Sequence, residues 1–451
     1  MNIHFLGAAD TVTGSRHLVD IDGQTILLDC GLFQGFKTLR ERNWAPLPLP
    51  AREIDAVVLS HAHLDHSGYL PALVKQGFKG AVHCTQATRD LAEVLLLDSA
   101  HLQEEDARRA NRHGFSRHAP ALPLYTVADA KRAIARLTPL PAGKTVRLGN
   151  VLAELTPVGH LLGACSVTLR HRDVTLVYSG DVGRSNDLLM PAPQRVPHAD
   201  VLLVESTYGN RVHPKEDAQQ QLGAIIRATL RRGGSVLLPS FAVGRAQALM
   251  LVLQRLKASG EIPEDTPVFL DSPMATAATT LYQKHRKLLR LSPREANSLC
   301  EGVTIVATPQ QSEKVSRARY PSVIISASGM ATGGRVLHHL KAMAPNPKHS
   351  IVFPGFQVAG TRGAKLVEGA TEVKIFGEYV AVKAQVSHIE GFSGHADADE
   401  LMQWLQGFDH APRQTYVVHG EPAAADALRS RIADALGWSV QVPEHLAQVQ
   451  V

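Results

Sequence analysis

Short apolar runs separated by polar turns predict that the chain begins as a β-sheet. The runs NIHFL, RHLVDI and QTILLDCG follow one another closely, and the last two meet at Asp22-Gly23, a dipeptide that favours a tight hairpin turn. A fourth run, IDAVVLS at residues 54–60, is almost wholly apolar, which is typical of a strand buried on both faces. We therefore expect a sheet to begin with the first three runs, and the fourth to be a buried strand.

The pattern changes twice further along the chain. Apolar residues recur at helical spacing over 86–112 and 127–137, which predicts two helices covering a sheet face, whereas NRHGFSRH at 111–118 predicts a solvated basic loop. Runs rich in Val, Leu and Thr then predict strands within 150–160, 165–171, 174–181 and 199–207. From about residue 208, longer helices alternate with the strand-like runs SVLLPS, PVFL, TIVA, SVIISASG and SIVFPG, as in a separate α/β unit.

Length and composition exclude several classes of protein. A chain of 451 residues exceeds the roughly 250–300 residues at which a single core stops growing, so more than one domain is expected. No apolar run approaches the ~18 residues of a membrane span, and the first residues do not resemble a secretory signal, so we expect a cytoplasmic protein without membrane contact. The four cysteines lie far apart and predict reduced core residues rather than a disulfide scaffold.

The net charge of +5 is unevenly distributed along the chain. Residues 209–385 contain 23 Lys and Arg against 12 Asp and Glu, a net charge of +11, which leaves −6 on the remainder. A basic surface of this size suits a polyanionic partner such as nucleic acid, because phosphate contacts release counterions. A basic surface that serves solubility alone is the other interpretation.

The stretch SHAHLDHSG at residues 60–68 concentrates groups that bind metals at the end of a predicted buried strand, where α/β folds place their chemistry. Imidazole and carboxylate are ligands that Zn²⁺ accepts, and so short a segment can face two ions. Further ligands must then come from the ends of later strand-like runs. The candidates are His61, His63, Asp65 and His66 in the stretch itself, and His160, Asp181 and His419 downstream.

These motifs resemble those of a known family. SHAHLDHSG, with LLDCG before it and GH and SGD after it, resembles the signature of the metallo-β-lactamase superfamily. VESTYGN (204–210), GFSGHAD (391–397) and VVHGE (417–421) resemble motifs A, B and C of the β-CASP nucleases. PSFAVGRAQ (239–247), DSPMA (271–275) and SASGMATGGR (326–335) are similar to the β-CASP domain of the polyadenylation-factor nuclease and its bacterial and archaeal relatives.

The resemblance implies an α/β fold in which a metallo-β-lactamase αββα sandwich carries an inserted α/β β-CASP domain. The expected segments are 1–208 and 386–451 for the metallo-β-lactamase domain and 209–385 for the β-CASP domain. It also implies two Zn²⁺ ions per chain, for which Mn²⁺ can substitute. One ion would be bound by His61, His63 and His160, the other by Asp65, His66 and His419, with Asp181 bridging both.

The resemblance further assigns catalytic roles to Asp65, Glu205 and His395. His395 would donate a proton to the leaving oxygen and Glu205 would orient His395, which leaves 5′-phosphate and 3′-hydroxyl ends. Asp29 is interpreted equally well as a brace for a ligand histidine or as a buried turn carboxylate. Independently of the resemblance, the candidate substrate contacts are Arg245, Ser328 and Gly329, since a guanidinium and the backbone N–H groups of a glycine-rich turn can bind phosphate; a surface salt bridge and a tight turn without a ligand are the other interpretations.

His419 in motif C favours RNA as the substrate, because DNA-processing members of the family typically carry valine there. We therefore expect a zinc-dependent endoribonuclease acting on single-stranded RNA in RNA processing or decay, with a homodimer expected by analogy. The alternatives are a DNA nuclease, another metallo-hydrolase such as a lactonase or thioesterase, and a non-catalytic RNA-binding scaffold. The last is disfavoured because all seven candidate ligands are present.

Overall fold

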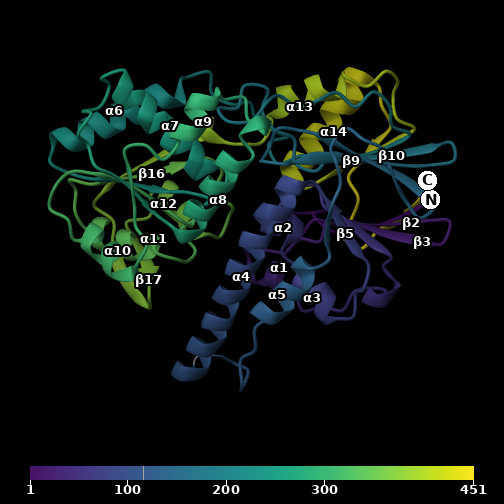
Figure 1. The fold of residues 1–451 in the computed structure, drawn as a ribbon, viewed down its shortest axis with the longest axis horizontal. Coiled ribbons are helices and arrows are strands. Elements are labelled where there is room, and N and C mark those ends of the chain that lie inside the picture. The colour runs from purple at the N-terminus through teal and green to yellow at the C-terminus, as the bar shows by residue number, and fades with distance from the viewer. Residues whose placement is uncertain (115) are drawn as a thin grey trace. The chain divides into compact units, whose positions relative to one another are not determined.

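The computed structural model describes residues 1–114 and 116–451, which form two compact units (Figure 1). Unit 1 comprises Met1–Val212 and His395–Val451, and unit 2 comprises His213–Gly394. The chain thus leaves unit 1 and returns to it. The two chain ends lie together, because the Met1 amino group donates a hydrogen bond to the Val451 carbonyl (3.1 Å).

Unit 1 contains two seven-stranded sheets. The first has the strand order β22-β1-β2-β3-β4-β5-β6. Its strands are β1 (Asn2–Gly7), β2 (Arg16–Ile21), β3 (Gln24–Leu28), β4 (Ala56–Val58), β5 (Ala81–Cys84), β6 (Leu137–Pro139) and β22 (Gln448–Gln450). The second has the order β21-β20-β11-β10-β9-β8-β7. Its strands are β7 (Val146–Leu148), β8 (Val151–Pro157), β9 (Cys165–His171), β10 (Val174–Tyr178), β11 (Val201–Glu205), β20 (Gln414–Val418) and β21 (Val440–Gln441).

The two sheets of unit 1 enclose its core. Phe5 and Leu28 from the first sheet pack with Val167 and Leu203 from the second in one buried cluster. The other face of the second sheet is covered by α13 (Ala398–Leu405) and α14 (Pro422–Leu436), shown in yellow in Figure 1, whose apolar residues pack on β10, β11 and β20. Burial of apolar surface on both faces of this sheet produces the expected layering of a sandwich.

The remaining helices of unit 1 lie between successive strands of the first sheet in sequence, from β3 to β6. They are α1 (Lys37–Glu41), the 3₁₀ turn η1 (Ala51–Glu53), α2 (Leu64–Ser67), α3 (Leu70–Lys75), α4 (Gln86–His113) and α5 (Val127–Ile134). Helix α4 confirms the predicted helix and ends at Gly114, whose φ of 63° suits a helix terminus. The predicted basic loop at 111–118 is helical up to His113, and Phe115 lies outside the described residues. Helix α5 ends before the predicted residue 137, because Leu137 begins β6.

Unit 2 is built on a parallel sheet of order β14-β13-β15-β12-β16-β19. Its strands are β12 (Val236–Pro239), β13 (Val268–Asp271), β14 (Val303–Ile305), β15 (Val323–Ser326), β16 (Ser350–Pro354) and β19 (Gln385–Ile389), and a separate hairpin joins β17 (Glu372–Ile375) to β18 (Glu378–Ala381). The five apolar runs predicted as strands each overlap one of these strands: SVLLPS, SVIISASG and SIVFPG contain β12, β15 and β16, while β13 extends one residue beyond PVFL and β14 begins one residue before TIVA. Parallel strands are buried on both faces, which explains their continuous apolar character.

The helices of unit 2 lie between these parallel strands in sequence, except that α6 precedes β12 and η3 follows β19. They are α6 (Ala218–Arg231), α7 (Arg245–Ala258), α8 (Pro273–Lys284), η2 (Arg286–Leu288), α9 (Pro293–Ser298), α10 (Pro309–Ser316), α11 (Val336–Met343), α12 (Arg362–Val367) and η3 (Glu390–Phe392). Leu337 and Leu340 of α11 pack with Ile324 and Phe353 of the sheet. Across both units, no helix within the described ranges is long and apolar enough to cross a membrane.

Candidate metal centre

The seven predicted ligands of unit 1 converge from the ends of strands in both sheets. His61 and His63 follow β4, while Asp65 and His66 lie on α2, directly after them. The other three come from the second sheet: His160 follows β8, Asp181 follows β10 and His419 follows β20. Residues that lie up to 358 positions apart in the sequence therefore meet at one edge of the sandwich.

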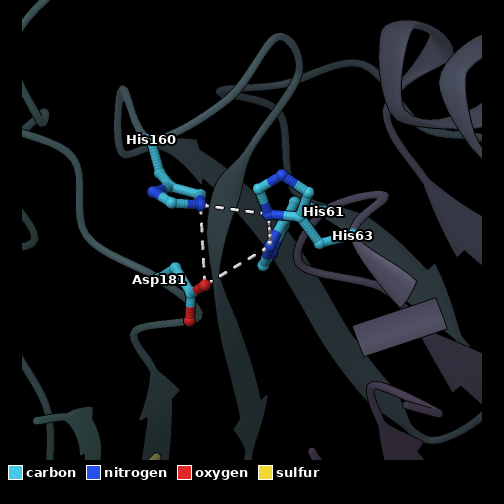
Figure 2. Close-up of side chains that lie close together, drawn as sticks. All are labelled: His61, His63, His160 and Asp181. Carbon is cyan, nitrogen blue, oxygen red and sulfur yellow. Dashed lines mark hydrogen bonds and ion pairs between the residues drawn. The ribbon is translucent and has the colours of Figure 1, made fainter. Parts of the chain in front are cut away.

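The first ligand group contains three imidazoles and one carboxylate (Figure 2). His63 Nδ1 lies 3.1 Å from His61 Nε2 and 3.2 Å from His160 Nε2. Asp181 Oδ2 lies 3.5 Å from His61 Nε2 and 3.6 Å from His160 Nε2. These four ligand atoms all lie within 4.8 Å of one another, which is compact enough to surround one metal ion.

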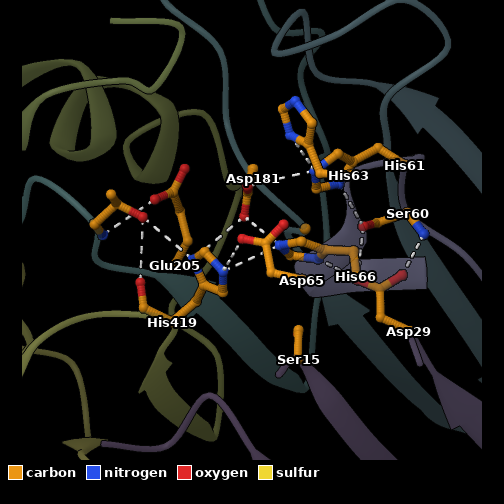
Figure 3. Close-up of polar contacts among 12 residues, drawn as sticks. Ser15, Asp29, Ser60, His61, His63, Asp65, His66, Asp181, Glu205 and His419 are labelled. Atoms are coloured by element: carbon orange, nitrogen blue, oxygen red, sulfur yellow. Dashed lines mark hydrogen bonds and ion pairs between the residues drawn. The ribbon is translucent and has the colours of Figure 1, made fainter. Parts of the chain in front are cut away.

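The second ligand group consists of Asp65, His66 and His419 (Figure 3). The Nε2 atoms of His66 and His419 face each other at 3.0 Å, and His419 Nε2 lies 3.7 Å from Asp65 Oδ2. Asp181 Oδ1 lies 3.2 Å from His66 Nε2 and 3.4 Å from His419 Nδ1. The two oxygens of Asp181 therefore face different groups, which suits a bridging carboxylate.

The buried polar atoms of both groups fit metal ions better than they fit one another. Asp181 is 1% exposed, and its Oδ1 makes no hydrogen bond of good geometry to any described residue. A buried acceptor without a donor is costly, and nitrogens of neighbouring imidazoles that face each other cannot all carry protons. A cation between these atoms would satisfy the oxygen and the nitrogen lone pairs together.

The pKa shifts of His61, His63 and Asp65 suit metal ligands, whereas for His66 burial is outweighed by the Asp181 and Asp29 carboxylates, which raise the pKa well above its ordinary value, so His66 must lose a proton to bind a metal. Burial lowers the pKa of His61 well below its ordinary value and lowers the pKa of His63 to about 4, so both imidazoles are neutral at pH 7. Burial opposes ionisation of Asp65, but its contact with His419 and the charges of nearby histidines outweigh burial and lower its pKa to about 2. Neutral imidazole and ionised carboxylate are the forms that bind metals.

A buried network orients His66. Asp29 Oδ2 lies 2.7 Å from His66 Nδ1, which makes Asp29 a brace for a candidate ligand as well as a buried turn carboxylate. Asp29 also accepts hydrogen bonds from the Ser60 amide (2.6 Å), the Ser60 hydroxyl (2.7 Å) and the Tyr178 hydroxyl (2.8 Å). The Ser60 hydroxyl lies 3.0 Å from His61 Nδ1. Carboxylates that fix the tautomer and orientation of a ligand histidine in this way strengthen metal binding.

The sequence analysis missed three polar residues of this network and its surroundings. Ser60 and Tyr178 hold Asp29, and the Thr207 hydroxyl lies 3.2 Å from His419 Nδ1. Ser60 begins the histidine-rich stretch itself, and Thr207 lies two residues after Glu205, so nearness to a motif was the available signal. Tyr178 ends a strand in which an aromatic residue is unremarkable.

The loop that carries Asp65 and His66 is packed directly against Gly31. The Cys30 amide donates a hydrogen bond to the His66 carbonyl (2.7 Å), and the Leu32 amide donates one to the Leu64 carbonyl (2.8 Å). A Cβ atom on Gly31 would lie 1.6 Å from the Asp65 carbonyl oxygen. The absence of a side chain at residue 31 is therefore required for this backbone pairing.

Replacing Gly31 by alanine is expected to displace the loop that carries Asp65 and His66. We expect Gly31→Ala to lower the free energy of unfolding by about 1–3 kcal/mol, the range for overpacking a buried site, and to reduce bound metal. Urea unfolding and elemental analysis measure the two effects. Gly333→Ala is the matched control, because a Cβ there meets no atom within 4 Å. A Gly31→Ala protein with unchanged metal content would show that the loop tolerates the shift.

Glu205 and His395 lie beside the ligand groups. Glu205 is 0% exposed and accepts hydrogen bonds from the amides of Val182 (2.7 Å) and Thr207 (3.1 Å). His395 Nδ1 lies 3.3 Å from Glu205 Oε1, and His395 Nε2 lies 3.9 Å from Asp181 Oδ2. Burial opposes protonation of His395, but the Glu205 and Asp181 carboxylates outweigh it and raise the pKa of His395 above its ordinary value.

The three predicted substrate contacts lie in unit 2, at the carboxyl ends of its parallel strands. Arg245 begins α7 after β12, and Ser328 and Gly329 follow β15. A Cβ on Gly329 would lie 2.8 Å from the Phe241 amide nitrogen, so the loops after β12 and β15 are in close contact. The Ser328 hydroxyl accepts a hydrogen bond from the Thr332 amide (3.2 Å).

Comparisons with family models and known proteins agree with this architecture. Residues 14–220 match the metallo-β-lactamase superfamily, residues 246–366 match the Beta-Casp domain, and residues 379–443 match a Zn-dependent metallo-hydrolase RNA specificity domain. A solved structure of a protein of unknown function from Enterococcus faecalis shares the fold, with a TM-score of 0.53 and 14% identity over 99% of both chains.

Two relatives match almost the whole chain. A protein of Thermus thermophilus named as a ribonuclease is 38% identical over 443 residues, which cover 96% of each chain. Transcription termination factor FttA of Methanocaldococcus jannaschii is 31% identical over 469 residues, which cover 100% of this chain and 72% of the relative. With both ligand groups in the metallo-β-lactamase sandwich and all three family models matched in one chain, the protein belongs to the β-CASP family of the metallo-β-lactamase superfamily.

Proposed function

We propose that the protein is a zinc-dependent ribonuclease that hydrolyses RNA phosphodiester bonds, mainly endonucleolytically on single-stranded RNA, in RNA processing or decay. The observation that carries the proposal is that two ligand groups share Asp181, with the Glu205–His395 pair beside them. We assign two Zn²⁺ ions to the chain, with Mn²⁺ as a substitute. His61, His63 and His160 would hold one ion and Asp65, His66 and His419 the other.

The reaction requires a nucleophile and a proton donor for the leaving oxygen. The two ligand groups would hold metal ions, which would supply a water-derived nucleophile for phosphorus at neutral pH. The residues of the chain hold that site in a fixed geometry: Asp29 orients His66, and Ser60 contacts both Asp29 and His61. Such a preorganised site needs little rearrangement during the reaction.

His395 is the proposed proton donor. Its Nδ1 faces the buried Glu205 carboxylate, so a proton on Nδ1 is held there and Nε2 is directed towards the ligand groups. The raised pKa of His395 favours the imidazole with protons on both nitrogens. The proton on Nε2 can then be transferred to the departing 3′ oxygen. Glu205 acts through His395 and is a positioning residue. Its own oxygens are fixed by the Val182 and Thr207 amides.

Three observations favour RNA as the substrate. Motif C carries His419, one of the two relatives above is named as a ribonuclease, and one matched family model is described as an RNA specificity domain. We further propose that residues 209–385, with a net charge of +11, act as the β-CASP domain and bind the RNA backbone. Arg245, Ser328 and Gly329 are proposed phosphate contacts there, and the protein is proposed to act in the cytoplasm as a homodimer.

We expect the purified protein to cleave single-stranded RNA but not matched single-stranded DNA. The metal content of the protein is measured before the assay. We expect internal cuts that leave 5′-phosphate ends, and we expect a chelator to abolish them and added Zn²⁺ to restore them. End-labelled substrates and mapping of product ends measure this. Cleavage of DNA alone would favour a DNA nuclease. A metal-loaded protein that leaves both substrates intact would exclude the proposed nuclease activity.

A further inference from the structure

Phe36 and Trp44 leave two large aromatic rings in solvent on one short segment of unit 1. Trp44 is 61% exposed and Phe36 is 52% exposed, whereas Trp404 is only 8% exposed. We call residues 36–44 the aromatic segment. Single exposed apolar residues are common on protein surfaces, but a cluster of them usually marks an interaction site.

The aromatic segment is also basic. It contains Lys37, Arg40 and Arg42 against Glu41, a net charge of +2. Lys37 and Arg40 are exposed, and the Lys37–Glu41 ion pair spans 3.5 Å between side chains that are both more than half exposed, so it is weak. Arg42 Nη1 and Nη2 donate hydrogen bonds to the two carboxylate oxygens of Asp10 (2.8 Å each). Two exposed cations and two exposed rings thus lie on one nine-residue segment.

Buried hydrogen bonds hold the aromatic segment in place. Asn43 is 6% exposed, and its Oδ1 accepts hydrogen bonds from the Phe33 amide (2.9 Å) and from Arg16 Nη2 (3.0 Å). Asn43 Nδ2 donates to the Phe33 carbonyl (2.8 Å). Arg16 is itself buried, with its guanidinium 3.8 Å from the Tyr69 ring centroid. Rings on a fixed segment lose little conformational entropy when a ligand stacks on them.

The aromatic segment follows closely, along the chain, a stretch that pairs with the loop of the candidate metal centre. The chain reaches Phe36 through Cys30–Phe33, and the amides of Cys30 and Leu32 are hydrogen-bonded to the loop that contains Asp65 and His66. The Arg16 Nε atom donates to the Gly31 carbonyl (2.8 Å) and so connects this pairing to Asn43. Phe36 therefore lies four residues along the chain from Leu32, which pairs with the loop of the candidate ligands, and both belong to unit 1.

We propose that the aromatic segment stacks unpaired bases of the single-stranded RNA whose backbone reaches the metal centre, a proposal that rests on the proposed ribonuclease function. Every base has a π-face that stacks on Trp or Phe, and Lys37 and Arg40 attract the flanking phosphates. A second copy of this chain is a poorer occupant, because in a symmetric interface the segment would face its own positive charge. Bases within a duplex are already paired and stacked on one another, so a surface that stacks bases selects single strands.

Steady-state cleavage of a short single-stranded RNA tests the proposal. Trp44→Ala is expected to raise KM about tenfold and to leave kcat within about twofold, since loss of one stacked base weakens binding by this order. Trp44→Phe should restore KM, whereas Trp44→Leu, which is apolar but cannot stack a base, should not. Hydrolysis of bis(4-nitrophenyl) phosphate, which has no base, should be unchanged in all three variants. Equal KM values for Trp44→Leu and the wild type would overturn the proposal.

Two further measurements separate this proposal from the proposed function. RNA should quench more tryptophan fluorescence in the wild type than in Trp44→Phe, and this signal does not depend on cleavage. Normal cleavage without that quenching would overturn only the stacking surface, whereas quenching without cleavage would overturn only the ribonuclease activity. Sedimentation of both proteins completes the test. A wild-type dimer that Trp44→Ala dissociates would identify the segment as a subunit interface and overturn the proposal.

Discussion

Asp181→Ala is expected to lose both bound metal and RNA cleavage. The two oxygens of Asp181 face different ligand groups, at 3.5–3.6 Å from His61 and His160 and at 3.2–3.4 Å from His66 and His419. Removing one carboxylate therefore weakens both sites at once and leaves several buried imidazoles without a compensating charge. We expect the metal content to fall below one ion per chain and the cleavage rate to fall by more than about a hundredfold. A loss of about a hundredfold is the largest typically seen when a residue that only orients a metal ligand is mutated.

Two variants make the Asp181 result interpretable. Asp173→Ala removes an exposed carboxylate from the turn between β9 and β10, on the same hairpin, and should change neither metal content nor cleavage. Asp181→Asn keeps the shape of the side chain and loses its charge, so it should also lose metal. Elemental analysis and circular dichroism report metal and folding separately. A folded Asp181→Ala protein that keeps two ions would mean that Asp181 does not bridge them.

The sequence predicted the candidate ligands because each one follows a strand-like run. His160, Asp181 and His419 lie far from the histidine-rich stretch in sequence, yet each ends an apolar segment, and strand ends meet at one sheet edge. The same reasoning could not reach Tyr178, since its contact with Asp29 joins residues 149 positions apart and a tyrosine in a strand is ordinary. Long-range side-chain contacts leave no local pattern.

The aromatic segment shows a second limit of sequence patterns. Helix α1 has five residues and no buried residue, so no apolar periodicity marks it, and the sequence analysis assigned no element there. Exposure of Trp44 depends on Asn43 turning inward to Phe33 and Arg16, a tertiary contact. In the same way, Leu137 continues the helical spacing of α5 but lies in β6, because pairing with β5 prevails over local periodicity. Tertiary contacts, rather than local sequence patterns, determine the exposure of Trp44 and the strand conformation of Leu137.

His395→Ala is expected to keep both metal ions and to lose most cleavage, which separates proton donation from metal binding. His395 Nε2 lies 3.9 Å from Asp181 Oδ2, but His395 lies outside the two groups assigned to the ions: it forms a third cluster with Asp181 and Glu205, and Glu205 holds its other nitrogen. Removing a general acid typically costs 10²–10⁴-fold in rate, so we expect kcat to fall by about that factor at unchanged metal content.

Comparing substrates with different leaving groups tests the role of His395 more specifically. A substrate whose leaving oxygen is 4-nitrophenolate needs little protonation, so His395→Ala should hydrolyse it at close to the wild-type rate while failing on RNA, whose 3′ oxygen needs a proton. Glu205→Gln should lose less RNA cleavage than His395→Ala and should also keep its activity on the 4-nitrophenyl substrate, because Glu205 acts through His395. The control is His410→Ala, which removes an exposed histidine of unit 1 and should match the wild type. Equal losses on both substrates in His395→Ala would assign His395 to the metal site instead, and full RNA cleavage would remove it from the mechanism.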